Sequence, residues 1–425
     1  MNKKCIIFFL MLFAMLACGG DDPVVEPAPV PVRRTIIVYV TADNNISSQL
    51  QNDITEMIEG SKILPDDCRL ILFSDYNIGS TGLPYIAEIK NGVKTELREY
   101  ANDFYATSAD NMTDVLQWIV EQSPADEYAL IMTGHGSGSI ITEDTIATTK
   151  YTKLYAYGYD NDGGQMSTAG NKWMNISSIA TALSNLKDTD GNRLHFEYIF
   201  FDCCCMQTVE VAYELRNYTD YVIAPVSETP ANGAPYTSVV PILGTNKDNI
   251  GAEIIKQYIE NTSWGRTGGI AISAIKTSEL QKLLELTRNA LHDIHEEGVK
   301  LQMNTSHCIY YFRCDESDDC PVLYDMKNLM LLNLEHSAYE TWLNQFNKTV
   351  VAKHTPIAST PWQTNINIDF YAFTVTDDNY GGLSMFIPRE IYDTVERRFP
   401  AGKSLNKTML TLEWTNAIGW HDLGW

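Results

Sequence analysis

Phe196-Glu197-Tyr198-Ile199-Phe200-Phe201 is a mostly apolar run that stops abruptly at Asp202-Cys203-Cys204-Cys205-Met206. A second run, Tyr128-Ala129-Leu130-Ile131-Met132, stops in the same way at Thr133-Gly134-His135-Gly136-Ser137-Gly138. Apolar runs of this length are typical of strands that are buried on both faces of a parallel sheet. Ligands of open α/β sheets bind in the crevice beyond the carboxyl ends of such strands. The two runs therefore predict a functional site where each strand ends.

The residues at these two strand ends suggest a particular chemistry. One end offers His135 on a glycine-rich turn, and the other offers a cysteine. A thiol becomes a useful nucleophile when a base or a cation lies nearby. The pair predicts a cysteine–histidine catalytic dyad.

Strands and helices are predicted to alternate through residues 35–276. The remaining predicted strands lie at 35–40, 70–73, 221–226 and 269–274, and the predicted helices begin near Ser47 or Ser48, Ser108, Ile176 and Val209. Ser47 or Ser48 is expected to cap its helix, which Gly60 closes. The alternation predicts an α/β fold with a doubly wound, mostly parallel sheet flanked by helices.

The pattern changes after residue 276. A long helix is predicted there with one apolar face, made by Leu280, Leu283, Leu284, Leu291 and Ile294. A late apolar run at 383–387 ends at Pro388 and is typical of a strand. We therefore expect a helical C-terminal subdomain, residues 277–425, that returns a strand to the sheet of a catalytic core at 35–276.

The N-terminus has the features of a bacterial lipoprotein leader. Lys3 and Lys4 precede an apolar segment that ends at Ala17-Cys18. The predicted signal peptide is residues 1–17, and Cys18 is the predicted lipidated residue; ordinary secretion is the alternative. Four prolines in residues 18–34 predict an extended tether. The expected location is the cell envelope, at the outer membrane or cell surface.

The charge of the chain limits its partners. Residues 1–17 carry two lysines and no acidic residue, so their removal leaves 29 basic and 54 acidic residues and a net charge of −25. Nucleic-acid binding is not expected, because it depends on a basic face that neutralises phosphates. A basic peptide would be attracted by the long-range field.

Seven cysteines remain outside the leader and the lipidation site, so at least one thiol is unpaired. Cys308, Cys314 and Cys320 are close enough in sequence for one local disulfide; a metal knuckle is a second interpretation, although the spacing matches no standard zinc site. No metal ligand set is predicted.

Several segments together resemble the clostripain family of cysteine peptidases, which are relatives of caspases, gingipains and legumain. The resemblance runs in order through about residues 35–390 and rests on five motifs: Val38-Tyr39-Val40-Thr41-Ala42-Asp43-Asn44-Asn45, Thr133-Gly134-His135-Gly136, Phe201-Asp202-Cys203-Cys204-Cys205-Met206, Ser227-Glu228-Thr229-Pro230 and Gly382-Leu383-Ser384-Met385-Phe386-Ile387-Pro388. Cysteines at 203 and 205 depart from the alanine and leucine of the family pattern. The resemblance implies a caspase-like fold and peptidase activity.

Residue roles follow from the resemblance and from strand geometry. Consecutive side chains that leave a strand point in opposite directions, so three adjacent cysteines cannot all face one crevice. The family register favours Cys204 as the nucleophile, with Cys203 and Cys205 as small buried residues. The resemblance implies His135 as the general base, with the amides of Gly136 and Cys204 forming an oxyanion hole.

The resemblance also implies specificity for Arg or Lys at the P1 position of a peptide. Asp202 takes the family's role at the floor of the S1 pocket, where a carboxylate pairs with a cation. A turn-capping aspartate is the alternative interpretation. Glu228 is a candidate second contact, but Asn232 and the surrounding loop are not acidic.

Two further expectations concern activation and cofactors. Relatives are often cleaved by their own activity between the histidine and cysteine segments, and Lys172 in a polar stretch is the preferred site here. No cofactor is expected, although calcium binding at Asp160-Asn161-Asp162-Gly163-Gly164 stays open; no Glu follows where an EF-hand needs one.

The predicted function is that of an endopeptidase that cleaves after Arg or Lys through an acyl-enzyme. The alternative is a catalytically degenerate surface lipoprotein that binds peptides or proteins, as the unusual triple cysteine suggests. A third, weaker interpretation is a zinc site built from His135 and two of the three cysteines, although neighbouring thiols are poorly placed around one ion.

Overall fold

The computed structural model describes residues 32–76, 83–140, 145–146, 157–160, 171–261, 270–304, 307–313, 321–355, 375–394 and 404–424. The predicted leader, Cys18 and most of the tether lie outside these ranges. In the ranges described, no helix has the length and apolar character needed to cross a bilayer.

The strands are β1 (Val32–Ala42), β2 (Cys68–Tyr76), β3 (Tyr85–Lys90), β4 (Val93–Glu99), β5 (Ala125–Thr133), β6 (Thr145–Ile146), β7 (Tyr157–Asp160), β8 (Asn171–Met174), β9 (Phe196–Asp202), β10 (Tyr221–Pro225), β11 (Ile272–Lys276), β12 (Tyr310–Arg313), β13 (Pro321–Asp325), β14 (Val350–His354) and β15 (Ser384–Phe386). The helices are α1 (Ser47–Gly60), α2 (Ala109–Gln122), α3 (Ile176–Asn185), α4 (Val209–Leu215), α5 (Tyr236–Val239), α6 (Lys247–Asn261), α7 (Leu280–Glu296), α8 (Met326–Asn333), α9 (His336–Thr349), α10 (Ile391–Thr394), α11 (Leu405–Met409) and α12 (Glu413–Ile418).

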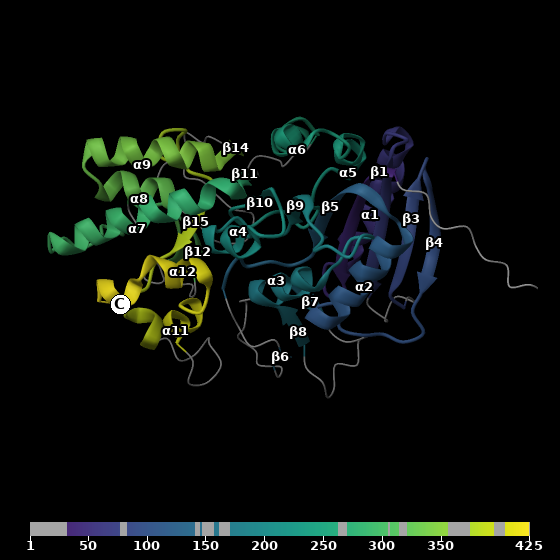
Figure 1. Cartoon of the computed structure of the whole chain (residues 1–425), viewed down its shortest axis with the longest axis horizontal. Helices are drawn as coiled ribbons and strands as arrows, with labels where there is room; N and C mark the ends of the chain where they lie inside the picture. The colour runs from purple at the N-terminus through teal and green to yellow at the C-terminus, as the bar shows by residue number, and fades with distance from the viewer. Residues whose placement is uncertain are drawn as a thin grey trace, which may run out of the picture.

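A nine-stranded sheet runs through the molecule in the order β14-β11-β10-β9-β5-β1-β2-β3-β4 (Figure 1). Its central strands β2, β1, β5, β9 and β10 are parallel, whereas β3 and β4 at one edge and β11 and β14 at the other are joined by antiparallel pairs. The doubly wound, mostly parallel sheet that the sequence predicts is therefore confirmed.

Both faces of the sheet are buried, and alternate residues of each central strand belong to different apolar clusters. In β1, Ile37 and Tyr39 lie in the cluster that includes α2, α3 and α4, whereas Ile36, Val38 and Val40 lie in the cluster that includes α1, α5 and α6. The apolar face of each amphipathic helix covers one side of the sheet. Figure 1 shows the helices on these two sides.

The parallel strands all end at one edge of the sheet. The loops that follow β1, β5, β9 and β10 begin at Asp43, Gly134, Cys203 and Val226. Because these loops leave neighbouring strands at the same edge, their first few residues lie close together. This arrangement brings the predicted histidine and cysteine turns to one place.

The C-terminal region supplies a strand to the main sheet, but not the strand that the sequence indicates. The returning strand is β14, which pairs with β11. The run at 383–387 forms β15, which pairs with β13 in a separate three-stranded sheet. The Ser384 amide donates to the Gln207 carbonyl, and this contact holds β15 beside the start of α4 instead.

The helices of the C-terminal region gather beyond β14, at the far end of the molecule from β3 and β4 (Figure 1). Their apolar residues, including Leu283 of α7 and Trp342 of α9, belong to the same cluster as those of α2, α3 and α4. The two parts thus share one core, and a boundary at residue 276 stays a prediction.

The start of α1 differs from the expected cap. Neither Ser47 nor Ser48 caps this helix; its N-cap residue is Ile46, which makes no side-chain cap bond. Instead, the Asn44 side-chain oxygen accepts a hydrogen bond from the Ile46 amide at 3.1 Å. The Asn44 side chain thus satisfies a backbone amide at the start of the helix through an Asx turn, a role that was expected of a serine.

Candidate active site

The turns that carry His135 and Cys204 lie side by side. Thr133 of β5 pairs with Asp202 of the parallel strand β9. His135 and Cys204 each lie two positions after these paired residues. The Gly136 backbone is so close to the second turn that a Cβ at this position would lie 2.6 Å from the Cys204 carbonyl oxygen. Strand register therefore juxtaposes the two predicted turns.

The turn after β5 needs glycine before the histidine. Gly134 has φ +148°, and a side chain at this position would collide with the Thr41 hydroxyl at the end of β1. The histidine that follows is partly buried, and its ring lies edge-on to Tyr159 with 6.4 Å between the ring centroids. Burial lowers the pKa of His135 below its usual value, so the neutral imidazole is favoured near neutral pH.

A side chain from the β1 loop holds the imidazole. His135 Nε2 lies 2.8 Å from the side-chain oxygen of Asn45. With this oxygen as acceptor, Nε2 carries the ring hydrogen and Nδ1 is the acceptor nitrogen of the neutral ring. The contact fixes the ring tautomer that can accept a proton.

Cys204 is the half-exposed member of the three cysteines. Its sulfur accepts a hydrogen bond from the Thr229 amide at 3.4 Å and lies 3.7 Å from the Thr229 hydroxyl, both in the loop after β10. Burial raises the pKa of the Cys204 thiol above its usual value. The resting site therefore holds a thiol and a neutral imidazole.

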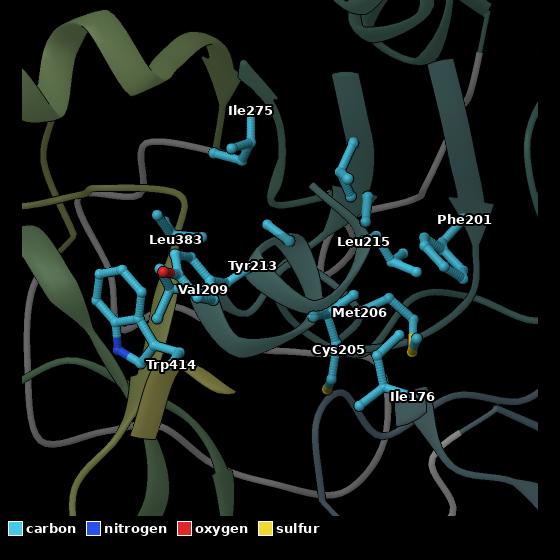
Figure 2. Close-up of a cluster of buried hydrophobic side chains, with 14 of the residues drawn as sticks. Ile176, Phe201, Cys205, Met206, Val209, Tyr213, Leu215, Ile275, Leu383 and Trp414 are labelled. Atoms are coloured by element: carbon cyan, nitrogen blue, oxygen red, sulfur yellow. The ribbon is translucent and has the colours of Figure 1, made fainter. Parts of the chain in front are cut away.

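The two flanking cysteines are buried, as predicted. The Cys203 thiol donates to the Met132 carbonyl of β5 at 3.2 Å. Cys205 has φ +59° and lies in the apolar cluster behind the turn, with Met206 and Ile176 (Figure 2). The left-handed backbone at Cys205 turns the chain from β9 toward α4, so the three sulfurs point in different directions.

Gly136 and Cys204 present two amides at the site. Among the described residues, neither the Gly136 amide nor the Cys204 amide donates a hydrogen bond. A side chain at Gly136 would meet the Cys204 carbonyl and Cys203, so only glycine fits there without movement. Two available donors beside a nucleophile are what an oxyanion hole requires.

Asp202 faces the opposite side of the sheet from Cys203 and is held by three donors. Its carboxylate accepts hydrogen bonds from the Ala234 amide at 2.8 Å, the Tyr236 hydroxyl of α5 at 3.0 Å and the Tyr258 hydroxyl of α6 at 2.8 Å. Burial nevertheless raises its pKa above the usual value. Asp202 therefore does more than cap a local turn, because two of its three donors come from the distant helices α5 and α6.

The acid beside Asp202 is Asp53 of α1. Oxygens of both side chains lie within 3.0 Å of the point that a Cβ on Gly233 would occupy. Glu228, in contrast, lies nearer Cys204, whose pKa its negative charge helps to raise. Its predicted contact with substrate stays a prediction.

The described residues do not form a metal site. In the part of the chain that the structure covers, no group of three or more His, Cys, Asp or Glu side chains is arranged to hold an ion. The arrangement of His135 and the three cysteines therefore gives the zinc interpretation no support. Of the acidic run considered for calcium, only Asp160 lies within the described residues.

Two other sequence predictions concern the cleavage site at Lys172 and the disulfide of Cys308. Lys172 does not lie in a polar loop but in β8, where it pairs with Thr145 of β6 and its carbonyl accepts from the Thr107 hydroxyl. Cys308 is buried and free of any disulfide to another described cysteine, whereas Cys314 and Cys320 lie outside the described residues.

Sequence reasoning missed three residues at this site. Asn45 ends the same kind of strand as the predicted residues, so its place in the chain could have indicated it. Asp53 follows the apolar spacing of α1, with Leu50, Ile54 and Met57, and an acid at such a position is unusual. Thr229 lies in one of the quoted motifs, but only the loop conformation brings its amide to the sulfur, so the sequence did not indicate this contact.

A comparison with known structures and families identifies the fold. The chain has a TM-score of 0.70 and 26% identity to a secreted C11 cysteine protease from Bacteroides thetaiotaomicron in complex with an irreversible peptide inhibitor, over 92% of this chain and 99% of the other. It has a TM-score of 0.69 and 22% identity to an inactive zymogen C11 protease from Parabacteroides distasonis, over 92% and 99%. No curated protein sequence matches the chain.

The family model of the clostripain family matches residues 38–379. This match covers the sheet, both turns of the site and most of the C-terminal region. The predicted caspase-like fold and the predicted family are both confirmed. The chain belongs to the clostripain family of cysteine peptidases.

Proposed function

We propose that this protein is an endopeptidase that cleaves peptide bonds after Arg or Lys, with Cys204 as the nucleophile and His135 as the general base. The observation that carries the proposal is the register of β5 and β9, which places Thr133 opposite Asp202 and sets the two turns side by side. The adjoining loops supply donors to the carboxylate, an acceptor for the imidazole and an amide for the sulfur.

The first half of the reaction forms a thioester. The Cys204 sulfur attacks the scissile carbonyl carbon as His135 takes the thiol proton. The resulting oxyanion accepts hydrogen bonds from the Gly136 and Cys204 amides. The imidazolium then gives its proton to the leaving amine, the C–N bond breaks, and the acyl group stays on sulfur.

The second half releases the acid product. His135 takes a proton from water, the hydroxide attacks the thioester carbonyl, and the same proton returns to the sulfur as the C–S bond breaks. The site starts with a neutral thiol and a neutral imidazole, because burial raises the pKa of Cys204 and lowers that of His135. We therefore expect proton transfer to accompany attack rather than to precede it.

The proposed P1 contact is Asp202, two residues before the nucleophile. Three hydrogen bonds fix its carboxylate at the edge of the sheet. A buried carboxylate that faces a cation makes a strong, charge-assisted contact. Peptides are the proposed substrates, as the peptide inhibitor bound to the Bacteroides thetaiotaomicron relative suggests.

The proposed location is the outside of a bacterial cell, with the chain held by a lipid on Cys18. The leader and the proline-rich tether support this, and the same relative is described as secreted. Cys18→Ala should move the protein from the detergent phase to the aqueous phase in a detergent phase separation. Equal partitioning of both proteins would reject the anchor but leave secretion intact.

The enzyme is also proposed to be made latent and activated by its own cleavage between His135 and Cys204. A fold relative described as an inactive zymogen makes latency plausible. Lys172 would require β8 to open, whereas Lys187 and Arg193 are exposed in the turn before β9. N-terminal sequencing of fragments present in wild type and absent in Cys204→Ala would locate the cut; identical fragments in both would reject self-cleavage.

The peptidase proposal is tested with reporter peptides that end in Arg, Lys or a neutral residue. Wild type should hydrolyse the first two, and Cys204→Ala should lose all activity. The matched controls are Cys203→Ala and Cys205→Ala, which should keep activity per folded molecule because neither sulfur faces the site. Activity that survives in Cys204→Ala would reject Cys204 as the nucleophile, and peptide binding without hydrolysis in wild type would favour the degenerate binding protein instead.

No cofactor is part of the proposed mechanism, because His135 and the two amides perform its proton transfers and charge stabilisation. We propose that any effect of calcium is on stability. Hydrolysis measured after exhaustive chelation and after calcium is restored would test this, and a rate that depends on calcium at constant folded fraction would contradict it.

A further inference from the structure

A carboxyl group of α1 is buried on the helix face that packs against the sheet. Asp53 is 2% exposed and shares this face with Leu50, Ile54 and Met57. Its Oδ2 atom has no hydrogen-bond partner among the described residues. A buried carboxylate without donors is costly, so the position calls for an explanation.

The carboxyl group of Asp53 faces that of Asp202. The Oδ2 atoms of Asp202 and Asp53 lie 2.7 Å and 3.0 Å from one point beside Gly233, the place of an absent Cβ. Gly233 has φ +61° in the loop that leads to α5, and it lets the backbone pass directly over both acids. Any larger residue would fill the space between them.

The charged and titratable groups around Asp53 come from β9, α1, α5 and α6. They are Asp202 of β9, Glu56 of α1, and the hydroxyls of Tyr236 and Tyr258 from α5 and α6. In the described ranges, no Lys, Arg or His faces either carboxyl group. The resting protein therefore holds two acids and no counter-charge at this place.

Two close carboxyl groups in such surroundings share a proton. Burial and the neighbouring Asp202 raise the pKa of Asp53 to about 9. Two like charges cannot both be accommodated until a cation arrives. Near neutral pH Asp53 therefore keeps a proton, and the pair is not doubly ionised.

We propose that Asp53 is a second specificity residue of the S1 subsite, and that the P1 cation binds the Asp53–Asp202 pair in exchange for the shared proton. This rests on the proposed function, which places the P1 side chain at Asp202. Asp202 already accepts three hydrogen bonds. The Oδ2 atom of Asp53, which has no partner among the described residues, would accept additional N–H groups of a guanidinium or ammonium. The released proton goes to solvent, and the pair becomes doubly ionised against the cation.

The sequence supports the choice of Asp53 over the loop residues. The loop beside the pair carries Asn232, which is exposed and neutral, and Glu228 lies toward the thiol. The second acid of the subsite thus comes from the helix after β1, and it lies beside Gly233 of the loop.

The first test compares peptides that are identical except for Arg or citrulline at P1. Citrulline keeps the shape of Arg without its charge. Asp53→Asn should lower the Arg-to-citrulline ratio of kcat/KM by about 10- to 100-fold, the value of one lost charged hydrogen bond. Hydrolysis of the citrulline peptide should fall much less than that of the Arg peptide, and Glu59→Gln, on an exposed position of the same helix, should keep the wild-type ratio.

Each outcome separates this inference from the proposed function. A wild-type enzyme that does not prefer Arg to citrulline would reject the P1 specificity itself. A wild-type preference that Asp53→Asn retains in full would overturn only the role of Asp53. A loss of equal size with both peptides would also overturn it, since that pattern indicates a structural role.

The second test needs no variant and so does not depend on one folding. Calorimetric titration of wild type with agmatine, in two buffers of different ionisation enthalpy at pH 7, measures the protons released on binding. We expect about one proton per agmatine bound. Binding with no proton release would overturn the exchange.

Discussion

The residues of the site explain how a cysteine and a histidine can remain uncharged until substrate arrives. Cys204 is shielded from water on one side and touches the Thr229 amide, and no cation lies among the groups that shift its pKa. His135 is partly buried, and its neutral form is favoured. In the proposed mechanism, activation therefore comes from the position of the base and from the oxyanion donors rather than from a preformed thiolate.

This resting state makes a prediction about alkylation. The rate at which iodoacetamide modifies Cys204 should rise on the order of tenfold per pH unit between pH 6 and 8, because only the thiolate reacts and its pKa is raised. Mass spectrometry of the tryptic peptide would follow residue 204 itself, with Cys204→Ala as the background. A rate that levels off below pH 7 would indicate a thiolate–imidazolium pair and contradict the prediction.

Asn45 gives a second prediction at this scale. Asn45→Ala should lower kcat by about 3- to 10-fold with little change in KM, because it removes one exposed hydrogen bond to the imidazole. Asn45→Asp, which keeps an acceptor oxygen, should restore kcat and move the acidic limb of the pH profile upward, since a carboxylate favours imidazolium. Asn232→Ala is the loop control; an unchanged kcat in Asn45→Ala would refute the assignment.

The sequence was sufficient for some of these residues and not for others. Local pattern predicts His135 and a cysteine among residues 203–205, because an apolar strand that ends in glycine or in a reactive side chain is visible in one short window, and the family register then selects Cys204. Asp53 and Thr229 act through contacts between distant segments, so their roles appear only when α1 and the β10 loop meet β9. Asn45 follows a predicted strand, so its position is a local signal, but its contact with His135 appears only in the folded chain.

At the scale of single elements, α4 connects the nucleophile turn to the C-terminal region. Its first turn holds Glu210, which is fully buried and accepts from the Phe386 amide of β15 at 2.8 Å. The Ser139 hydroxyl, from the histidine loop, lies 3.4 Å from its other oxygen. One side chain therefore joins both catalytic turns to β15.

Glu210 makes the stability of the fold depend on pH. Burial raises its pKa from 4.5 to about 7, so the folded protein binds this proton more tightly than the unfolded chain does. The stability that the protonated form gives is complete below pH 4.5 and is lost as the pH rises through about 7, a change on the order of 3 kcal/mol. Glu210→Gln should flatten the free energy of unfolding between pH 5 and 8, as measured in urea; the same slope in both proteins would show the assignment to be wrong.

The prediction of elements succeeded where apolar residues repeat with a clear period or form a continuous run. Helical spacing predicted α2, and β1, β5 and β9 were predicted from continuous apolar runs. The strand at 383–387 was assigned to the wrong sheet because its partner, β13, lies far away in sequence and pairs through tertiary contacts. The residues of a segment indicate whether it forms a strand, but they do not indicate which strand it pairs with.

At the scale of the whole molecule, the chain is strongly acidic. Its predicted mature form carries a net charge of −25. A field of this sign attracts basic substrates and is screened by salt. Raising NaCl from about 20 to about 200 mM should lower kcat/KM several-fold for peptides with additional Lys or Arg outside P1, and much less for peptides with neutral flanks. Equal salt dependence of both peptide sets would show that the field does not steer substrate.

The most direct test of the account is covalent labelling by a peptidyl chloromethylketone with Arg at P1, read by mass spectrometry of the modified peptide. The account predicts stoichiometric modification of Cys204 in wild type, with loss of labelling in His135→Ala. Modification at Cys203 or Cys205, or equal labelling of Cys204 without the imidazole, would contradict it.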